Sequence, residues 1–219
     1  MNEFYAPYIE RENAYYRTLQ AGKPSGGNLG SQALNEAVDW LCQGSRSILD
    51  FGCGSGGMLV CCWFRGVRKL TGIDLASEGI ACASRYAAFL PEAECDFQCG
   101  SIDKLTAFSD ECFDGLILSN ILDNLRPEDA VAALREAART LKRGGKALVK
   151  LNPVITPEQI KAWNMRLIGE DLLDDGLLLW NRDDAHWRQL LSGYFSDIQQ
   201  RDVYFEEADM HNRLFLCVK

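Results

Sequence analysis

The sequence predicts an α/β fold with a single, mostly parallel, doubly wound sheet and helices on both faces. Strand-like and helix-like segments alternate from residue 47 to residue 151, a pattern typical of parallel sheets. A glycine-rich turn follows the first strand-like segment, as it does where such sheets bind ligands at their carboxyl edge. The chain has 219 residues, of which 47% are hydrophobic. This is enough for one domain with a substantial core.

The expected elements follow one another with short connections. Ser31 is a suitable N-cap for a helix that continues to about Gln43, and Gly44 would end it. The strands expected next are 47–51, 70–74, 95–99, 113–119 and 146–151, the last entered through a Gly144-Gly145 turn. The helices expected between them are 58–65, 78–90 and 127–141. Segments 198–205 and 213–218 alternate like two paired strands and bring the expected sheet to seven strands.

Two segments lie outside this alternation. Residues 1–30 are expected to form a helical cap and a glycine-rich connector, and residues 31–219 the main domain. The aromatic side chains of the cap either pack on the main domain or form a lid over a ligand. Residues 152–185 contain a helix signal at 157–165, an Asp-Gly hairpin signal and a helix cap at Asp183. This insertion forms either a wall of a substrate pocket or a surface elaboration.

Charge and cysteine content restrict the class of protein. The formal net charge is −8 and the pI about 4.9, so nucleic acid and anionic membranes are poor partners. The nine cysteines are scattered, and the closest pairs, Cys61-Cys62 and Cys95/Cys99, have no second pair or histidine nearby; we expect no metal site. The first residues do not resemble a signal peptide, and no apolar run reaches membrane-spanning length. A cytoplasmic protein with reduced thiols is expected.

The glycine-rich segment 48–57 fits two kinds of nucleotide-like ligand. Gly52, Gly54 and Gly57 have the spacing of the dinucleotide fingerprint. Gly52, Gly54 and Gly56 have the spacing found in methyltransferases. The glycines alone therefore do not choose between NAD and another adenosine cofactor.

Two aspartates near this loop carry more information. Asp74 ends the second expected strand, where a carboxylate can accept hydrogen bonds from both ribose hydroxyls of either cofactor. Asp50 directly precedes the loop, where its charge would repel a pyrophosphate. The same charge suits a ligand that carries an ammonium and a sulfonium group.

Two further segments, Phe113–Leu125 and Leu141–Leu148, complete a family pattern. With them the chain resembles the class I S-adenosylmethionine-dependent methyltransferases of the small-molecule type over roughly residues 31–151. The tail from Trp187 is similar to the last helix and terminal hairpin of that family. The resemblance implies a Rossmann-like seven-stranded sheet with its last strand antiparallel. It also implies S-adenosyl-L-methionine as cofactor, S-adenosyl-L-homocysteine as product and a small-molecule acceptor.

The resemblance also assigns cofactor-binding residues by position. Asp74 would bind the ribose and Leu75 would pack on the adenine. Ser101 and Ile102 would grip the adenine edge. The residues that would hold the methionine part are Asp50, Phe51, Gly52, Cys53, Gly54 and Gly56, and those that would face the methyl group and the acceptor are Ser119 and Asn120.

The chain departs from the family pattern at two positions. The family often has Asp where this chain has Ser101, so adenine recognition would rest on the Ser101 hydroxyl and backbone or on Asp103. Many members have His near the position of Asn124, and this chain does not. The family's Asn-Pro-Pro-aromatic signature for exocyclic amines of bases is also absent after the fourth strand.

A general base is therefore not assigned by the sequence. Methyl transfer needs one only if the acceptor must lose a proton. The weak candidates near the expected pocket are Tyr15, Tyr16, Asp123 and His186. Each also has a purely structural explanation: packing for the tyrosines, a solvated charge at a helix entry for Asp123, and a place in a first helical turn for His186.

Two other functions remain open at this level. The chain could bind S-adenosylmethionine without catalysis, as a sensor or a partner subunit, since no base is evident. An NAD-binding oxidoreductase is supported only by the spacing of the glycines and Asp74.

Overall fold

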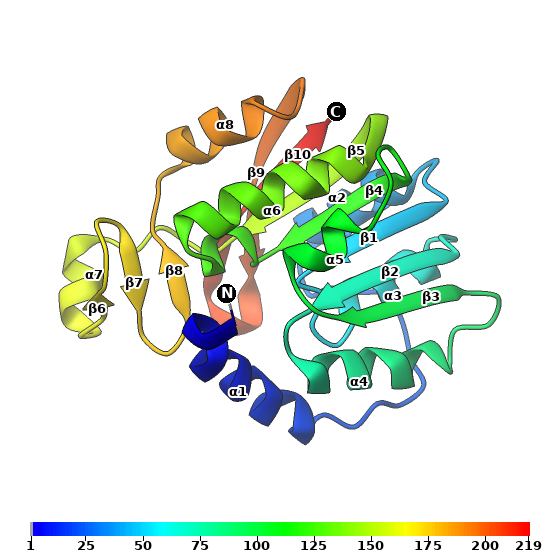
Figure 1. The fold of residues 1–219 in the computed structure, drawn as a ribbon, viewed down its shortest axis with the longest axis horizontal. Coiled ribbons are helices and arrows are strands. Elements are labelled where there is room, and N and C mark those ends of the chain that lie inside the picture. Colours follow the sequence, from blue (N-terminus) through cyan, green and yellow to red (C-terminus); the bar gives the residue numbers. More distant parts are fainter. Residues whose placement is uncertain (1) are drawn as a thin grey trace.

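The computed structural model describes residues 2–219, which form a seven-stranded central sheet in the order β3-β2-β1-β4-β5-β10-β9. β10 runs antiparallel to both of its neighbours, β5 and β9, while β3, β2, β1, β4 and β5 are parallel (Figure 1). The predicted α/β class and the antiparallel last strand are confirmed. The strands are β1 (Ser47–Phe51), β2 (Lys69–Asp74), β3 (Glu94–Cys99), β4 (Phe113–Ser119), β5 (Leu141–Leu151), β9 (Asp197–Phe205) and β10 (Met210–Val218).

Helices cover both faces of the sheet because successive strand side chains point to opposite faces. Leu49 and Phe51 of β1 pack in one apolar cluster with α5, α6 and α8, and Ile48 packs in a second cluster with α2, α3 and part of α4. These helices are α2 (Gln32–Cys42), α3 (Gly57–Phe64), α4 (Ser77–Ala87), α5 (Ile102–Thr106), α6 (Pro127–Thr140) and α8 (Asp184–Ser192).

Most predicted boundaries lie within a few residues of the observed ones, and those of β1 and β4 coincide. The Gly144-Gly145 turn was predicted before the fifth strand, but β5 already begins at Leu141. Gly144 has a positive φ of 71° inside this strand, and the β4–β5 register shifts between Phe113 and Gly115. The glycine therefore kinks the strand rather than preceding it. Ser31 occupies the N-cap position of α2, but its side chain makes no capping hydrogen bond.

The insertion folds into a small antiparallel sheet, β6-β7-β8. Its elements are α7 (Pro157–Ala162), β6 (Arg166–Leu167), β7 (Leu172–Asp174) and β8 (Leu178–Trp180). The predicted Asp-Gly hairpin is present, with Gly176 at a φ of 96° in its turn. The predicted helix in this region ends three residues earlier, at Ala162.

The N-terminal helix α1 (Asn2–Thr18) crosses from α6 to α4. Tyr5 donates a hydrogen bond of 2.7 Å to Asp129 on α6, and the amide of Glu78 on α4 donates one of 2.9 Å to Asn13. α1 therefore spans the carboxyl edge of the parallel strands. No helix in residues 2–219 combines the length and apolar character needed to cross a membrane.

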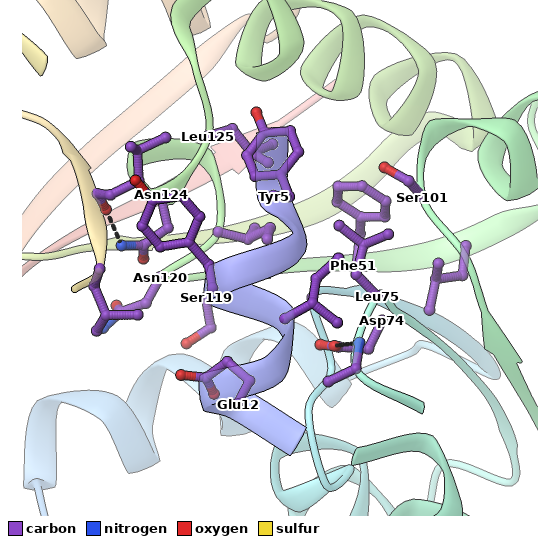
Figure 2. A pocket seen from close by; sticks show the side chains of 18 of the residues that line it. Tyr5, Glu12, Phe51, Asp74, Leu75, Ser101, Ser119, Asn120, Asn124 and Leu125 are labelled. Carbon is purple, nitrogen blue, oxygen red and sulfur yellow. Dashed lines mark hydrogen bonds between the residues drawn. The ribbon is translucent and has the colours of Figure 1, made fainter. Parts of the chain in front are cut away.

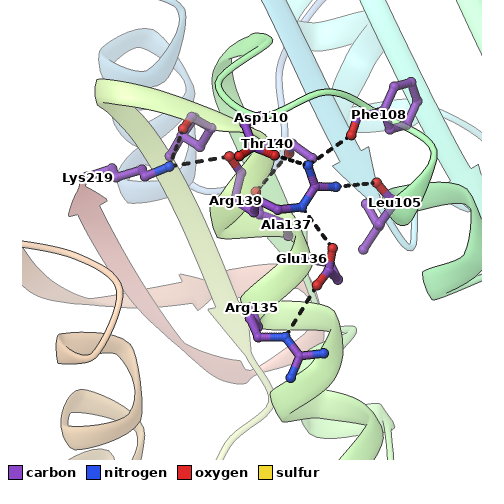
Figure 3. A network of polar contacts seen from close by, with 10 residues as sticks. Leu105, Phe108, Asp110, Arg135, Glu136, Ala137, Arg139, Thr140 and Lys219 are labelled. Carbon is purple, nitrogen blue, oxygen red and sulfur yellow. Dashed lines mark hydrogen bonds and ion pairs between the residues drawn. The ribbon is translucent and has the colours of Figure 1, made fainter.

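A hydrogen-bonded network holds the opposite, amino-terminal edge of the sheet (Figure 3). Arg139 near the end of α6 donates to the carbonyls of Leu105 and Phe108 at 3.1 and 2.9 Å and to the carboxylates of Asp110 and Glu136 at 2.5 and 2.9 Å. These contacts fasten α5 and the chain that leads into β4 to the end of α6.

Candidate functional site

A cavity of about 340 Å³ lies at the carboxyl ends of β1, β2 and β4, under α1. In Figure 2, Phe51, Asp74, Leu75 and Ser101 lie on one side of α1, and Ser119, Asn120 and Asn124 lie on the other. This is the edge at which doubly wound sheets bind ligands. Further lining residues come from α1, the loop after β4 and the insertion: Tyr5, Tyr8, Ile9, Glu12, Tyr16, Ile121, Leu125, Asn152, Leu177 and Leu178.

The glycine loop requires glycine at its first position. Gly52 has a φ of 82°, and an added Cβ would lie 2.8 Å from the Cβ of Ile121. Its amide and that of Cys53 both donate to the carbonyl of Ile73, at 2.8 and 3.0 Å. The loop therefore presents bare backbone to the cavity at Gly52.

Asp50 lies beneath this loop as a buried carboxylate. It is 1% exposed, and its Oδ1 has no hydrogen-bond partner within residues 2–219. Burial, with a further contribution from the charge of Asp74, raises the pKa of Asp50 to about 8. An unpaired buried carboxylate of this kind is stabilised by a nearby cation. Asp50 therefore fits the ammonium and sulfonium groups of the expected cofactor, although its side chain does not line the cavity.

Asp74 lines the cavity and also braces its wall. One carboxylate oxygen accepts from the amide of Gly54 at 2.8 Å and the other from the amide of Ala76 at 2.7 Å. Burial raises the pKa of Asp74, and these two hydrogen bonds oppose that shift. Each carboxylate oxygen has a second lone pair, so the group can still accept hydrogen bonds from two ribose hydroxyls.

The other predicted cofactor residues divide into two groups. Phe51, Leu75, Ser101, Ser119 and Asn120 line the cavity with Gly52 and Asp74. The predicted residues that do not line it are Asp50, Cys53, Gly54, Gly56 and Ile102.

Two side chains of this second group, those of Cys53 and Ile102, are packed elsewhere in the fold. Cys53 is buried, and an added Cβ on Gly72 of β2 would lie 2.7 Å from its sulfur. Ile102 packs against the core at the start of α5. Asp103, the alternative for adenine recognition, accepts from the amide of Ser101 at 2.9 Å and lies outside the cavity lining.

α1 contributes two polar side chains to the cofactor side of the cavity. The hydroxyl of Tyr16 covers Gly54, where an added Cβ would collide with it. Glu12 lines the cavity and is hydrogen-bonded to Tyr16. Burial and then the charge of Asp74 raise the pKa of both Glu12 and Tyr16. Glu12 was not identified from the sequence, although it is a carboxylate on the same helical stripe as Tyr5, Tyr16 and the other cavity-lining residues of α1.

Among the weak catalytic candidates, only Tyr16 lines the cavity. Tyr15 is 56% exposed on the outer side of α1. His186 makes edge-to-face contacts with Trp180 and Trp187, with ring centroids 5.0 and 6.0 Å away, and burial lowers its pKa. Neither Tyr15 nor His186 is placed to take a proton from an acceptor in the cavity.

Asp123 does not lie at a solvated helix entry. It is 0% exposed in a short 3₁₀ turn, η1 (Leu122–Asn124), behind the cavity lining. Its Oδ2 accepts from the backbone and side-chain amides of Asn152 at 2.7 and 3.1 Å, and burial raises its pKa. The sequence suggested a surface charge because it did not show that β5 and its following residues would cover η1.

Lys150 on β5 is a buried lysine that the sequence did not indicate. It is 8% exposed, and its Nζ donates to Oδ1 of Asn120 at 2.6 Å. Burial lowers the pKa of Lys150 to about 8, against the opposing charge of Asp123. Asn120 has a left-handed φ of 52° and also donates from its side chain to Asn152 at 3.0 Å. These contacts hold a strained residue at the floor of the cavity.

The chain matches a protein family and several curated proteins. Residues 49–149 match the family described as methyltransferase domain. The chain is 31% identical over 130 residues to the aclacinomycin 10-hydroxylase RdmB of Streptomyces purpurascens, covering 56% of this chain and 32% of that protein. It is 31% identical over 111 residues to a ubiquinone biosynthesis O-methyltransferase of Albidiferax ferrireducens, covering 50% of this chain and 43% of that protein. The chain thus spans less than half the length of these curated relatives.

Solved structures share the whole fold at lower identity. The 1,6-didemethyltoxoflavin-N1-methyltransferase of Burkholderia thailandensis, solved with 1,6-didemethyltoxoflavin and S-adenosylhomocysteine, has a TM-score of 0.69 at 17% identity and covers 100% of this chain and 89% of its own. A methyltransferase from Methanosarcina mazei has a TM-score of 0.67 at 21% identity, covering 79% and 92%. The strand order, the glycine loop and the family match over residues 49–149 agree, so the chain is similar to the class I S-adenosylmethionine-dependent methyltransferases, whose cofactor is S-adenosyl-L-methionine.

Proposed function

We propose that this protein transfers a methyl group from S-adenosyl-L-methionine to a small-molecule acceptor. The observation that carries the proposal is the buried carboxyl group of Asp50, whose Oδ1 has no partner within residues 2–219, beneath a bare glycine loop that lines the cavity at Gly52. The same cavity carries Asp74 and Glu12 on its wall. This acidic surrounding favours a cationic cofactor over a pyrophosphate.

Each part of the cofactor has a place in this arrangement. The methionine part would lie against Gly52, with Asp50 beneath. The ribose hydroxyls would donate to Asp74, and the adenine would pack on Leu75 beside Ser101. Glu12 of α1 would add a negative charge above this half of the cavity. We propose accordingly that residues 1–30 are a cap over the cofactor and that 152–185 shape the acceptor side.

The chemistry is a displacement at the methyl carbon. S-adenosylmethionine supplies the methyl group as a sulfonium electrophile, so the protein's main task is alignment. Ser119 and Asn120 end β4 at the cavity floor, and the contacts of Asn120 to Lys150 and Asn152 fix that floor. The acceptor's lone pair forms the new bond to the methyl carbon while the carbon–sulfur electron pair goes to sulfur.

The names of similar proteins support a small acceptor. The Burkholderia thailandensis methyltransferase was solved with 1,6-didemethyltoxoflavin, a small molecule, and another similar protein is a ubiquinone biosynthesis O-methyltransferase. Neither name settles the acceptor of this chain. A cytoplasmic location belongs to the same proposal and is supported by the free state of all nine cysteines along the described chain.

Isothermal titration with S-adenosylmethionine and S-adenosylhomocysteine tests the proposal first. We expect both to bind the folded protein with one site per chain. Transfer of a labelled methyl group to a mixture of small acceptors tests the second step. The cofactor assignment would be contradicted if the folded protein bound neither compound, or if it bound NADH instead.

Cofactor binding without methyl transfer is the second candidate. It is favoured by the lack of a histidine or lysine among the described residues that line the cavity, and by the name of one relative, a hydroxylase. Under this alternative the protein binds S-adenosylmethionine but gives no labelled product with any acceptor.

A further inference from the structure

The acceptor side of the cavity is mainly aromatic and aliphatic. Both carboxylates that line the cavity, Glu12 and Asp74, lie with the cofactor-binding residues. The opposite half is closed by α1, by the loop after β4 and by the β7–β8 hairpin. The apolar and aromatic side chains that close it are Tyr5, Tyr8, Ile121, Leu125, Leu177 and Leu178.

Three polar side chains of this half, those of Tyr5, Tyr8 and Asn124, are already paired with protein groups. The hydroxyl of Tyr5 donates to Asp129 at 2.7 Å and accepts from the amide of Arg126 at 3.0 Å. The hydroxyl of Tyr8 is hydrogen-bonded to Asp174 on β7. Because their hydroxyls are engaged in this way, the two tyrosines offer their rings to a ligand.

The amide of Asn124 is paired in the same way. Its Nδ2 donates to the carbonyl of Leu178 at 2.5 Å, and its Oδ1 accepts from Asn152 at 3.2 Å (Figure 2). Asn124 occupies the place near which many family members have a histidine. Here it joins the loop after β4 to β8 and closes the wall of the cavity.

The described lining of this space lacks a positively charged side chain. Among the described residues that line the cavity there is no lysine, arginine or histidine. Lys150 lies behind Asn120, whose side chain it binds. A carboxylate or phosphate in the acceptor half would lose its hydration without a compensating partner, which is costly.

We infer that the acceptor is a flat, uncharged aromatic or heteroaromatic molecule that carries its own nucleophilic oxygen or nitrogen. This inference rests on the proposed methyl transfer. The ring packs between the tyrosine rings and the leucines of the hairpin. The nucleophile's lone pair forms the bond to the methyl carbon, and the carbon–sulfur pair stays on sulfur. The acceptor's proton then passes to water, since none of the described residues that line this half is a histidine or a lysine.

Labelled methyl transfer to paired acceptors tests the inference. The pairs are catechol with 3,4-dihydroxybenzoate, 2-naphthol with 6-hydroxy-2-naphthoate, and 8-hydroxyquinoline with its 5-sulfonate, with ethanolamine and glycerol as aliphatic acceptors. We expect product from neutral aromatics at a kcat/KM at least tenfold above that of their anionic partners. Equal turnover of the anionic partners, or turnover of the aliphatic compounds alone, would overturn the inference.

A charge change in the hairpin sharpens the test. Leu177 lines the cavity at an exposed turn, so Leu177→Arg places a cation at the acceptor side without filling the core. We expect Leu177→Arg to raise the anionic-to-neutral ratio of kcat/KM at least tenfold, while the matched Leu177→Gln leaves that ratio within threefold. An unchanged ratio in Leu177→Arg would contradict the assignment of this half to the acceptor.

Cofactor titration separates the two proposals. If S-adenosylmethionine binds but none of the neutral aromatics is methylated, the acceptor class is wrong and the cofactor assignment stands. If S-adenosylmethionine does not bind the folded protein, the proposed function itself fails.

Discussion

The two edges of the central sheet differ in how their charged side chains are paired. At the amino-terminal edge, Arg139 is matched by two carboxylates and two carbonyls. Asp114 at the same edge accepts from Lys142 at 2.6 Å and from the Ser47 amide at 3.0 Å. Burial alone would raise the pKa of Asp114, but its hydrogen bonds, that from Lys142 foremost, lower it to about 2.

The carboxyl edge is the reverse case. Burial raises the pKa values of Asp50, Asp74 and Glu12, and the charge of Asp74 raises those of Asp50 and Glu12 further. One oxygen of Asp50 and one of Asp123 have no partner within the described chain. Buried polar groups are normally satisfied. Paired charges therefore support the fold at one edge, whereas buried carboxyl groups with raised pKa values at the other edge prepare a site for a cationic ligand.

The largest effect is expected from Asp74→Ala on the ligand-binding edge. Loss of the charge-assisted ribose contact should weaken S-adenosylmethionine binding by about 1.5–3 kcal/mol, or roughly 10- to 150-fold. Titration calorimetry measures the change. Asp103→Ala is the matched control, because its carboxylate caps the Ser101 amide outside the cavity. If both variants bind like the wild type, Asp74 is not the ribose ligand.

Arg139→Ala tests the opposite edge. It removes hydrogen bonds to two carbonyls and two carboxylates, so the free energy of unfolding should fall by about 1–3 kcal/mol, with part-exposure of the arginine limiting the loss. Urea denaturation gives the stability, and titration gives the cofactor affinity, which we expect to change less than twofold. A large loss of cofactor affinity with unchanged stability would contradict the assignment of this edge to stability and of the other edge to ligand binding.

The Asp50→Asn variant tests how the buried carboxyl group makes the stability of the fold depend on pH. A folded-state pKa of about 8 exceeds the unfolded value, so folded protein holds a proton that unfolded protein has lost between about pH 4 and 8. Wild-type stability should fall as pH rises through this range, and the fall should be smaller in Asp50→Asn. Denaturation at pH 5 and pH 8 measures the difference.

The Asp50→Asn variant also tests whether Asp50 interacts with the bound cofactor. A cationic cofactor should lower the pKa of Asp50, so its binding near pH 7 should release up to one proton, detected as a dependence of the binding enthalpy on the buffer. Asp50→Asn should bind more weakly and release less. Equal proton release by both proteins would show that Asp50 does not sense the cofactor.

Glu12→Gln is expected to have the smallest effect. Removing one partly exposed charge from α1 should weaken S-adenosylmethionine binding by about 0.2–1 kcal/mol. The loss for S-adenosylhomocysteine should be smaller, because it lacks the sulfonium charge. Titrations of both compounds against Glu12→Gln and the matched outward-facing Glu10→Gln test this. An identical effect on both compounds would place Glu12 away from the sulfur.

The sequence by itself determined the order of the elements, the glycine loop and the positions of Asp50 and Asp74. These are local properties: apolar periodicity defines strands and helices, and a left-handed turn at Gly52 requires glycine. Because parallel strands bring their carboxyl ends to one edge, the position of Asp74 at the end of β2 was enough to place it at the site.

Only the tertiary structure decided which distant residues complete the cavity. Glu12 reaches the cavity from α1, and the burial of Asp123 and Lys150 depends on how β5 packs against η1 and Asn120. Sequence patterns do not contain these contacts, because burial and pairing depend on residues far apart in the chain. In the folded chain, the polar atoms of Tyr5, Tyr8 and Asn124 are hydrogen-bonded to other protein groups. These side chains look polar in the sequence, yet they form part of a mainly apolar wall of the cavity.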